Sequence, residues 1–316
     1  MSSSASQPKG KTLIIVHDVL GTLFDLSAPI AEIKKLFASQ LGPDPVVADR
    51  YAELIVMDWY HAGQRDFSFL SLNSAYTPIG TVFKSCLPRV LLQAGLVPPS
   101  SSDQSSSKPV SAEELKQTRL DLSSSRQGGG GDKAVEAFAS VTEEVMASLQ
   151  TLTPRPGMTE AFRQAHRASP EHGGLASIRL WGATNGSLSL AEKLFENASV
   201  PTINSTGDAG GAAVNAGLWS CDEAEVAKPD PRVYGAVKKR VLAEAGLEGA
   251  SENEYILFFV ASHSWDVDAA KRAGFHTLWM TYEEFSPASG IYLEPDLRAN
   301  DLVEGARLIR EWVANH

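Results

Sequence analysis

The stretch TLIIVHDVLGTLFDL, residues 12–26, decides the fold. It opens with an apolar run, TLIIV, which is typical of a parallel strand buried on both faces. The run ends at His17 and Asp18, and a short turn containing Gly21 follows. Open α/β sheets bind their ligands at the carboxyl ends of such strands. Asp18 is therefore a candidate nucleophile, metal ligand or turn cap, whereas strand alternation points His17 to the opposite side, where we expect a structural role.

Similar apolar runs recur along the chain: SIRLWGA at 177–183, YILFFV at 255–260 and HTLWM at 276–280. Helical patterns lie between them, namely LAEKLFENA at 190–198, RVYGAVKKRVLAEAG at 232–246 and DVDAAKRAG at 266–274. Strands that alternate with helices predict an α/β fold with a parallel, doubly wound sheet.

The alternation stops between residues 27 and 150. This part contains helical patterns and no convincing strand: PIAEIKKLFASQL, VVADRYAELIVMDWYHAG, GTVFKSCLPRVLLQAGL and DKAVEAFASVTEEVMASLQ. We therefore expect a core formed by residues 1–26 and 151–316, with a helical cap at 27–150. Serine and glycine dominate residues 100–131 and predict a flexible loop in the cap, with a short helix inside it at SAEELKQTRLDL, residues 111–122.

Composition excludes several function classes. The formal net charge is −10, so a nucleic-acid partner is not expected, and no apolar stretch approaches the roughly 20 residues that span a bilayer. The N-terminal segment MSSSASQPKGK is polar and does not resemble a signal peptide. Only two cysteines occur, Cys86 and Cys221, which does not indicate a disulfide framework. We expect a cytoplasmic protein with neither a membrane nor a nucleic-acid partner.

Four loops carry residues suited to chemistry, and in a doubly wound sheet such loops can converge on one crevice. An aspartate can form an ester that water later cleaves, and a nearby lysine keeps it ionised. Hydroxyl and amide groups can hold an anionic substrate, and a second carboxylate can orient the lysine or activate water. Each residue is a weak signal alone, but their order along the chain is a strong joint signal. The set is Asp18 and Thr22, then Thr184 and Asn185, then Lys228, then Ser262, His263 and Asp266.

These motifs resemble the haloacid dehalogenase superfamily over nearly the whole chain. That resemblance implies a Rossmann-like core with a nucleophilic aspartate, here Asp18, followed in order by Thr184, Lys228 and Asp266. Most phosphatases of this superfamily carry DxDGT and a further aspartate four residues before the final acid. Here these two positions are Leu20 and Ser262.

The branch that the chain resembles is that of the 2-haloacid dehalogenases. HDVLGTLFD is similar to that branch's FDAYGTLFD, and SHSWDVDAAKRAGF is similar to its SNAWDVAGAKAAGF. KPDPRVY fits as well, and its Tyr234 either holds Lys228 or packs in its helix. The resemblance implies an enzyme that needs no metal or other cofactor. Its aspartate displaces halide from the α-carbon of a small carboxylic acid, and the resulting ester is hydrolysed while a helical cap excludes water.

The chain departs from the branch at three positions. The branch has Ser at the position of Ala261 and Asn at the position of His263. Its cap also carries an arginine that receives the departing halide; matching WRQKQLEY-like patterns to YHAGQRDF at 60–67 puts His61 there, with Arg65 four residues further on. A neutral imidazole is a weaker anion receptor than guanidinium. His61 and His263 are then candidates for binding a substrate carboxylate or for acid–base work.

The leading hypothesis is a metal-independent hydrolase with Asp18 as nucleophile, Lys228 and Asp266 as its catalytic partners and an anionic carboxylic acid as substrate. The substrate-binding candidates are Thr22, Thr184, Asn185, His61, His263 and Ser262. A magnesium-dependent phosphatase, an enzyme for a non-halogenated compound such as a secondary metabolite, and a catalytically silent binding protein are the alternatives. A homodimer stays open as an assembly.

Overall fold

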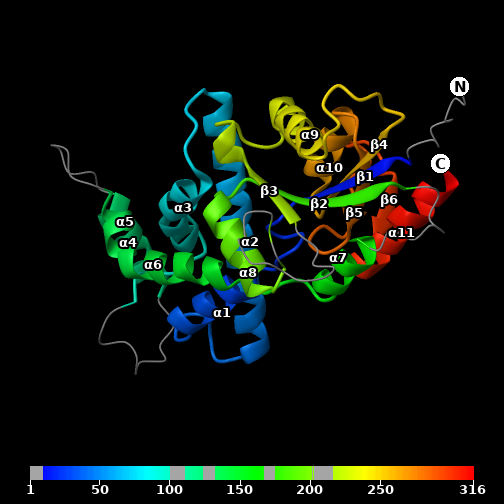
Figure 1. Cartoon of the computed structure of the whole chain (residues 1–316). Helices are drawn as coiled ribbons and strands as arrows, with labels where there is room; N and C mark the ends of the chain where they lie inside the picture. Colours follow the sequence, from blue (N-terminus) through cyan, green and yellow to red (C-terminus); the bar gives the residue numbers. More distant parts are fainter. Residues whose placement is uncertain (1–9, 100–110, 124–131, 167–174, 201, 203–215) are drawn as a thin grey trace, which may run out of the picture. The chain divides into compact units, whose positions relative to one another are not determined.

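A computed structural model describes residues 10–99, 111–123, 132–166, 175–200, 202 and 216–316 (Figure 1). The chain divides into two compact units. The sheet unit comprises residues Met1–Asp25 and Pro154–His316, and the helical unit comprises Leu26–Thr153. Most of the loop expected at 100–131 lies outside the described residues. The short helix expected within it is present as α4, Ala112–Ser123.

Among its described residues the sheet unit contains six parallel strands in the order β3-β2-β1-β4-β5-β6. Along the chain, β2 and β3 are added on one side of β1, and β4, β5 and β6 are then added on its other side. The direction in which strands are added therefore reverses at β1. Such a reversal is where doubly wound sheets place their ligand crevice. The predicted fold class, a parallel α/β core with an inserted helical unit, is confirmed. The strand bounds are β1 Thr12–His17, β2 Ser177–Thr184, β3 Ala216–Ser220, β4 Tyr255–Ala261, β5 His276–Met280 and β6 Leu297–Ala299.

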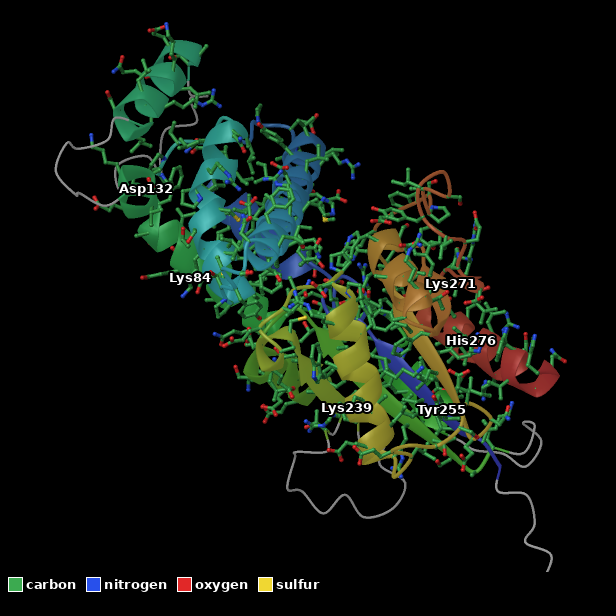
Figure 2. All side chains as sticks on the ribbon, turned by 90° about the horizontal axis from the view of Figure 1, so that it is seen from above. Lys84, Asp132, Lys239, Tyr255, Lys271 and His276 are labelled. Atoms are coloured by element: carbon green, nitrogen blue, oxygen red, sulfur yellow. The ribbon has the colours of Figure 1, made fainter. Side chains whose placement is uncertain are left out.

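Helices cover both faces of the sheet (Figures 1 and 2). On one face α9, which carries Lys239, packs beside α10, which carries Lys271. On the other face α7 packs against α11, and α8 packs against β2 and β3. This double cover explains why all residues of β1 and β4 are buried. The helix bounds are α7 Met158–His166, α8 Leu188–Asn197, α9 Pro231–Glu244, α10 Ser264–Arg272 and α11 Leu302–Asn315.

The helical unit has its own core, built largely around the long helix α2. Asp44 caps this helix through its side chain, and Pro45 occupies the first turn, where a missing N–H costs nothing. Trp59 of α2 donates its indole N–H to the Phe83 carbonyl of α3 at 2.9 Å. Among its described residues this unit contains helices and no strand. Its elements are α1 Ser27–Leu36, α2 Pro45–Leu72, α3 Ile79–Gln93, α4, α5 Lys133–Ala137, α6 Ala139–Ser148 and the 3-10 turn η2 Leu149–Thr151.

Several elements differ from the sequence-based expectation. Helix α2 continues nine residues past Gly63, so this glycine does not mark a helix end; the Phe83 ring occupies the space where a side chain at Gly63 would lie. The pattern at 132–150 is broken at Phe138 into α5 and α6. Strands β3 and β6 were not predicted: β3 is AGLWS, in which only Leu218 and Trp219 are large and apolar, and β6 has three residues. No helix in the described part of the chain is long and apolar enough to cross a membrane.

Candidate active site

The nucleophile turn, residues 18–22, starts where β1 ends. The Asp18 N–H donates to the Val260 carbonyl at 2.9 Å, which continues the ladder between β1 and β4. Gly21 has a φ of 84°, which a glycine adopts without steric cost. The Thr22 hydroxyl donates to Asp18 Oδ2 at 3.0 Å and accepts the Ser262 N–H at 2.9 Å. The turn is therefore fixed to the end of β4, and one oxygen of the Asp18 carboxylate has a defined partner.

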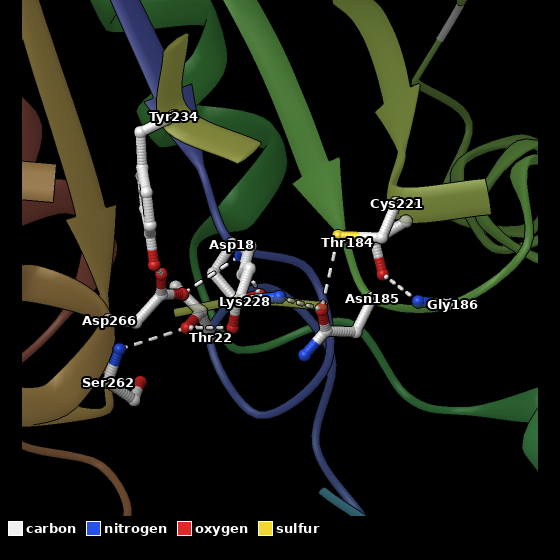
Figure 3. Close-up of polar contacts among 10 residues, drawn as sticks. All are labelled: Asp18, Thr22, Thr184, Asn185, Gly186, Cys221, Lys228, Tyr234, Ser262 and Asp266. Carbon is white, nitrogen blue, oxygen red and sulfur yellow. Dashed lines mark hydrogen bonds and ion pairs between the residues drawn. The ribbon is translucent and has the colours of Figure 1, made fainter. Parts of the chain in front are cut away.

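Three charged residues meet at the carboxyl ends of the strands, and we call them the lysine cluster: Asp18, Lys228 and Asp266 (Figure 3). Lys228 Nζ lies 2.9 Å from Asp18 Oδ1 and 2.9 Å from Asp266 Oδ2. Lys228 follows β3, and Asp266 lies in the first turn of α10. The side chains of Lys228 and Asp266 are 1% and 0% exposed, while that of Asp18 is 11% exposed. Of the three, the nucleophile candidate is the one most accessible to a substrate.

Burial and charge oppose each other within the lysine cluster. Burial alone lowers the pKa of Lys228, but the negative charges of Asp18 and Asp266 outweigh it and raise this pKa above its ordinary value. Lys228 therefore stays a cation across the neutral range. Burial raises the pKa of Asp266, although hydrogen bonds from Lys228 and Tyr234 oppose the rise.

Tyr234 of α9 donates its hydroxyl to Asp266 Oδ1. Of the two roles left open for Tyr234, holding Lys228 or packing in its helix, the structure shows a link to the lysine through Asp266, since both side chains bond this carboxylate. Burial and the Asp266 charge raise the pKa of Tyr234 well above its ordinary value, so it remains a donor. Both oxygens of Asp266 are thus bonded, one to Tyr234 and one to Lys228.

The loop after β2 presents polar groups beside the lysine cluster (Figure 3). Thr184 Oγ1 accepts the Gly186 N–H at 2.9 Å, and an accepting hydroxyl keeps its own O–H for donation. The Asn185 carbonyl oxygen accepts the Lys228 N–H at 3.1 Å and the Cys221 thiol at 3.2 Å. These bonds turn the Asn185 NH₂ group away from Lys228 and Cys221. Burial raises the pKa of Cys221 to about 12, which keeps this thiol a donor.

Ser262 and His263 follow β4. Besides its bond to Thr22, Ser262 donates its hydroxyl to the Gly21 carbonyl at 3.2 Å. His263 is 1% exposed, and its Nε2 lies 3.2 Å from Glu283 Oε2. The His263 ring stacks on Trp265 with 5.4 Å between centroids. The structure thus brings Ser262 to the nucleophile turn and places His263 against a carboxylate.

Glu283 and Arg155 were missed by the sequence analysis. Glu283 Oε1 accepts a bond from Arg155 Nη2 at 3.0 Å, and Arg155 Nη2 also donates to the Gly21 carbonyl at 2.9 Å. A signal was present, because Glu283 follows the predicted strand HTLWM as Asp18 follows TLIIV. Arg155 gave no comparable signal, since it lies in a loop before α7.

His61 and Arg65 lie on α2 in the helical unit, where both side chains are exposed. Arg65 pairs with Asp66 at 3.2 Å, and the His61 ring lies 5.8 Å from the Tyr60 ring. The role of His61 as a halide receptor remains a prediction. Within the described ranges, no group of three or more His, Cys, Asp or Glu side chains is placed to hold a metal ion.

Comparison with known proteins supports the resemblance seen in the motifs. No family model matches the chain. A segment of 98 residues is 31% identical to (S)-2-haloacid dehalogenases of Pseudomonas putida and Pseudomonas fluorescens. That segment is 31% of this chain and 37% of each of these relatives.

Solved structures extend the likeness over the whole chain. An L-2-haloacid dehalogenase from Xanthobacter autotrophicus superposes with a TM-score of 0.55 at 17% identity, covering 94% of this chain and 98% of that one. A structure described as a dehalogenase gives a TM-score of 0.59 at 17% identity, covering 96% and 98%. The chain has the fold of the 2-haloacid dehalogenases. Within this dehalogenase fold, the lysine cluster occupies the carboxyl edge of the sheet.

Proposed function

We propose that this protein is a hydrolase that releases halide from C2 of a small 2-halocarboxylic acid through an ester on Asp18. A carboxylate oxygen of Asp18 attacks C2, and the carbon–halogen bond breaks with its electron pair leaving on the halide. Water then adds to the Asp18 carbonyl carbon of the ester and loses a proton. The C2 oxygen takes up that proton and leaves as the hydroxyl of the 2-hydroxy acid, and Asp18 is regenerated as a carboxylate with one oxygen from water when the second proton of the water is released.

The observation that carries this proposal is the single Lys228 ammonium between two carboxylates, 2.9 Å from each. The lysine holds Asp18 in one orientation together with Thr22. Asp266 is fixed by Tyr234 and orients the lysine. Its buried carboxylate, whose pKa is raised, is also our candidate base for the water that cleaves the ester.

The loop after β2 is our candidate site for the substrate carboxylate. The Thr184 hydroxyl and the Asn185 amide N–H groups are donors held in place by their bonds to Gly186, Cys221 and Lys228. Fixed donors bind an anion at a lower entropic cost than mobile ones. We propose that these two side chains place C2 in front of the Asp18 carboxylate.

Halide release tests the proposal directly. We expect chloride or bromide from one hand of 2-chloropropionate or 2-bromopropionate, together with the inverted 2-hydroxy acid, because displacement at C2 occurs once from the opposite side. In a single turnover in H₂¹⁸O, mass spectrometry of the peptide containing Asp18 should show one heavy oxygen. Product labelled at its hydroxyl in that single turnover, with Asp18 unlabelled, would mean direct attack by water and no ester.

Chelation by EDTA distinguishes the phosphatase alternative. Leu20 and Ser262 stand where phosphatases of the resembled superfamily have carboxylates, so we expect activity to survive EDTA. Hydrolysis of an aryl phosphate that is lost in EDTA and restored by magnesium would assign the protein to the phosphatases. Alkylation of Asp18 by another electrophile without halide release from any haloacid would instead indicate a non-halogenated substrate.

A further inference from the structure

A second cluster of buried charge lies beside the lysine cluster, and we call it the turn clamp: Arg155, Glu283 and His263. Glu283 is its centre, with Oε1 3.0 Å from Arg155 Nη2 and Oε2 3.2 Å from His263 Nε2. The side chains of His263 and Glu283 are 1% and 5% exposed, and that of Arg155 is 17% exposed. Ions so poorly hydrated are stable only when each has a close partner of opposite charge.

The turn clamp holds the nucleophile turn at Gly21. The Gly21 carbonyl accepts one bond from Arg155 at 2.9 Å and another from the Ser262 hydroxyl at 3.2 Å. On the other side of this residue, a Cβ at Gly21 would lie 2.7 Å from Glu283 Oε2. Only glycine lets the Glu283 carboxylate come so close to the turn. The peptide three residues after Asp18 is therefore fixed by groups from three other segments of the chain.

The charge of the turn clamp depends on His263. Burial lowers the pKa of His263, but Glu283, Asp18 and Glu284 outweigh it and raise this pKa above 6.5. Glu284 lies on the same loop as Glu283 and accepts bonds from the N–H and hydroxyl of Ser264. Trp265, in the first turn of the helix that His263 caps, contributes a neutral ring, and Arg155 from the loop before α7 contributes a positive charge.

Protonation of His263 changes the summed charge of the two clusters. The lysine cluster holds two carboxylates and one lysine, a net charge of −1. The turn clamp holds two cations and one carboxylate when His263 is protonated, a net charge of +1, and is neutral when it is not. Protonation of His263 therefore makes the summed charge of the two clusters one unit more positive. An anionic substrate is therefore repelled less when His263 carries its proton.

We infer that Arg155, Glu283 and His263 are positioning residues that hold the nucleophile turn, and that the protonated clamp is the form that accepts an anionic substrate. This inference rests on the proposed function for its substrate, but the clamp itself is defined by contacts with the turn. It also assigns a use to His263, one of the positions where the chain departs from the branch that it resembles.

The inference is tested by steady-state kinetics from pH 6 to 9. The substrate is the 2-halopropionate that the wild type turns over. We expect the wild-type KM to rise about tenfold as His263 loses its proton, with a midpoint above 6.5. Glu283→Gln removes the negative charge, so the midpoint should move to lower pH and kcat should fall as the turn loosens. His263→Asn should abolish this rise of KM with pH. The matched control is Glu160→Gln, which removes an exposed carboxylate paired with Arg163 on α7.

A titration of the His263 ring by NMR separates this inference from the proposed function. Histidine-labelled protein is titrated as wild type and as Glu283→Gln, and His263→Asn assigns the signal. We expect a midpoint above 6.5 in the wild type and a lower one in Glu283→Gln. An unchanged midpoint overturns the clamp, whether or not halide is released. If the wild type releases no halide, the proposed function fails and this titration alone decides on the clamp.

A second variant covers the case in which Glu283→Gln does not fold. Glu283→Asp keeps the charge with a shorter reach, so its KM midpoint should stay above 6.5 while kcat falls, because Gly21 is held less firmly. If the KM of Glu283→Asp does not rise with pH near neutrality, the inference is overturned. It is also overturned if the KM of His263→Asn keeps the wild-type rise with pH.

Discussion

The two clusters of buried charge at the carboxyl edge of the sheet are built in opposite ways. In the lysine cluster two carboxylates share one cation, whereas in the turn clamp one carboxylate lies between two bases. The cation of the first cluster keeps its proton across the neutral range, because two negative charges raise its pKa. The second contains a histidine, which can titrate near neutral pH. In the proposed function, the permanent charge of Lys228 holds the carboxylate that attacks the substrate. The titratable charge of His263 controls how readily an anionic substrate binds.

Asp18→Asn should produce the largest effect, because it removes the proposed nucleophile from the lysine cluster and leaves the turn clamp intact. An amide is nearly isosteric with the carboxylate but cannot form the ester, so we expect turnover to fall about a thousandfold or more. The fold should persist, and the ring of His263 should still titrate. Halide release is measured on freshly purified protein whose intact mass excludes deamidation. Turnover near that of the wild type would show that Asp18 is not the nucleophile.

Lys228→Met breaks the lysine cluster at its only cation. Two buried carboxylates then face each other without compensation, and breaking such an ion pair costs about 3–5 kcal/mol of unfolding free energy. Turnover should fall about a hundredfold or more, since the orientation of Asp18 is lost. The loss of stability should be smaller at pH 5 than at pH 7, because burial and mutual repulsion make one carboxylate take up a proton.

Urea unfolding at the two pH values measures this effect. Lys239→Met is the matched control, because Lys239 lies exposed on α9 (Figure 2). Equal stability of Lys228→Met and Lys239→Met at pH 7 would contradict the assigned role of Lys228 in the cluster.

Much of the fold could be predicted because the sheet is buried on both faces. Strands β1, β2, β4 and β5 contain recognisable apolar runs, whereas β3 has only two large apolar residues, Leu218 and Trp219, and β6 has three residues, one of them exposed. Gly63 suggested a helix end, but this glycine leaves room for the Phe83 ring of another helix, and α2 continues past it. A single sequence contains no information on which ring fills the space beside a glycine.

The candidate site was predictable to the same extent. Asp18 and Lys228 are 210 residues apart in sequence, and only the strand order predicts that they meet. Neither residue was a strong signal alone; they were identified because candidate residues follow successive predicted strands in one order along the chain. Glu283 met the same criterion but had no counterpart in the resembled motifs, and Arg155 contacts Gly21 through a long side chain from a loop. Contacts made by long side chains across loops leave no periodic trace in the sequence.

Tyr234→Phe weakens the lysine cluster without changing its charge. It removes the hydroxyl that donates to Asp266 Oδ1 and leaves that buried oxygen without its donor, which costs about 1–3 kcal/mol. We expect turnover to fall about tenfold, because Asp266 still bonds Lys228 but is less firmly held. Thermal unfolding and halide release are compared with Tyr292→Phe, a partly exposed tyrosine on the loop before β6. Identical behaviour of the two variants would show that the Tyr234 hydroxyl is dispensable.

The smallest effect on turnover is expected at His17, the buried histidine on the other side of the strand end. Its Nδ1 lies 3.3 Å from the Trp181 carbonyl, and its ring packs on Phe162 at 5.0 Å. Burial lowers the pKa of His17 from 6.5 to about 4, because no carboxylate compensates as Glu283 does for His263. The two histidines therefore show that burial alone and burial beside a carboxylate shift the same side chain in opposite directions.

This opposition predicts stability as a function of pH. For His17 the unfolded chain takes up a proton below pH 6.5 and the folded protein does not until about pH 4, so stability is lost as pH falls through that window. A shift of 6.5 minus 4, or 2.5 units, at about 1.4 kcal/mol per unit corresponds to roughly 3 kcal/mol. For His263 the sign is reversed: its contribution is complete below pH 6.5 and is lost as pH rises through its higher folded pKa.

Urea unfolding of the wild type, His17→Gln and Glu283→Gln from pH 4 to 9 separates the contributions of the two histidines. His17→Gln should flatten only the acid side and Glu283→Gln chiefly the alkaline side. If His17→Gln keeps the full acid slope, the neutral state assigned to His17 is wrong and the contrast between the two histidines fails.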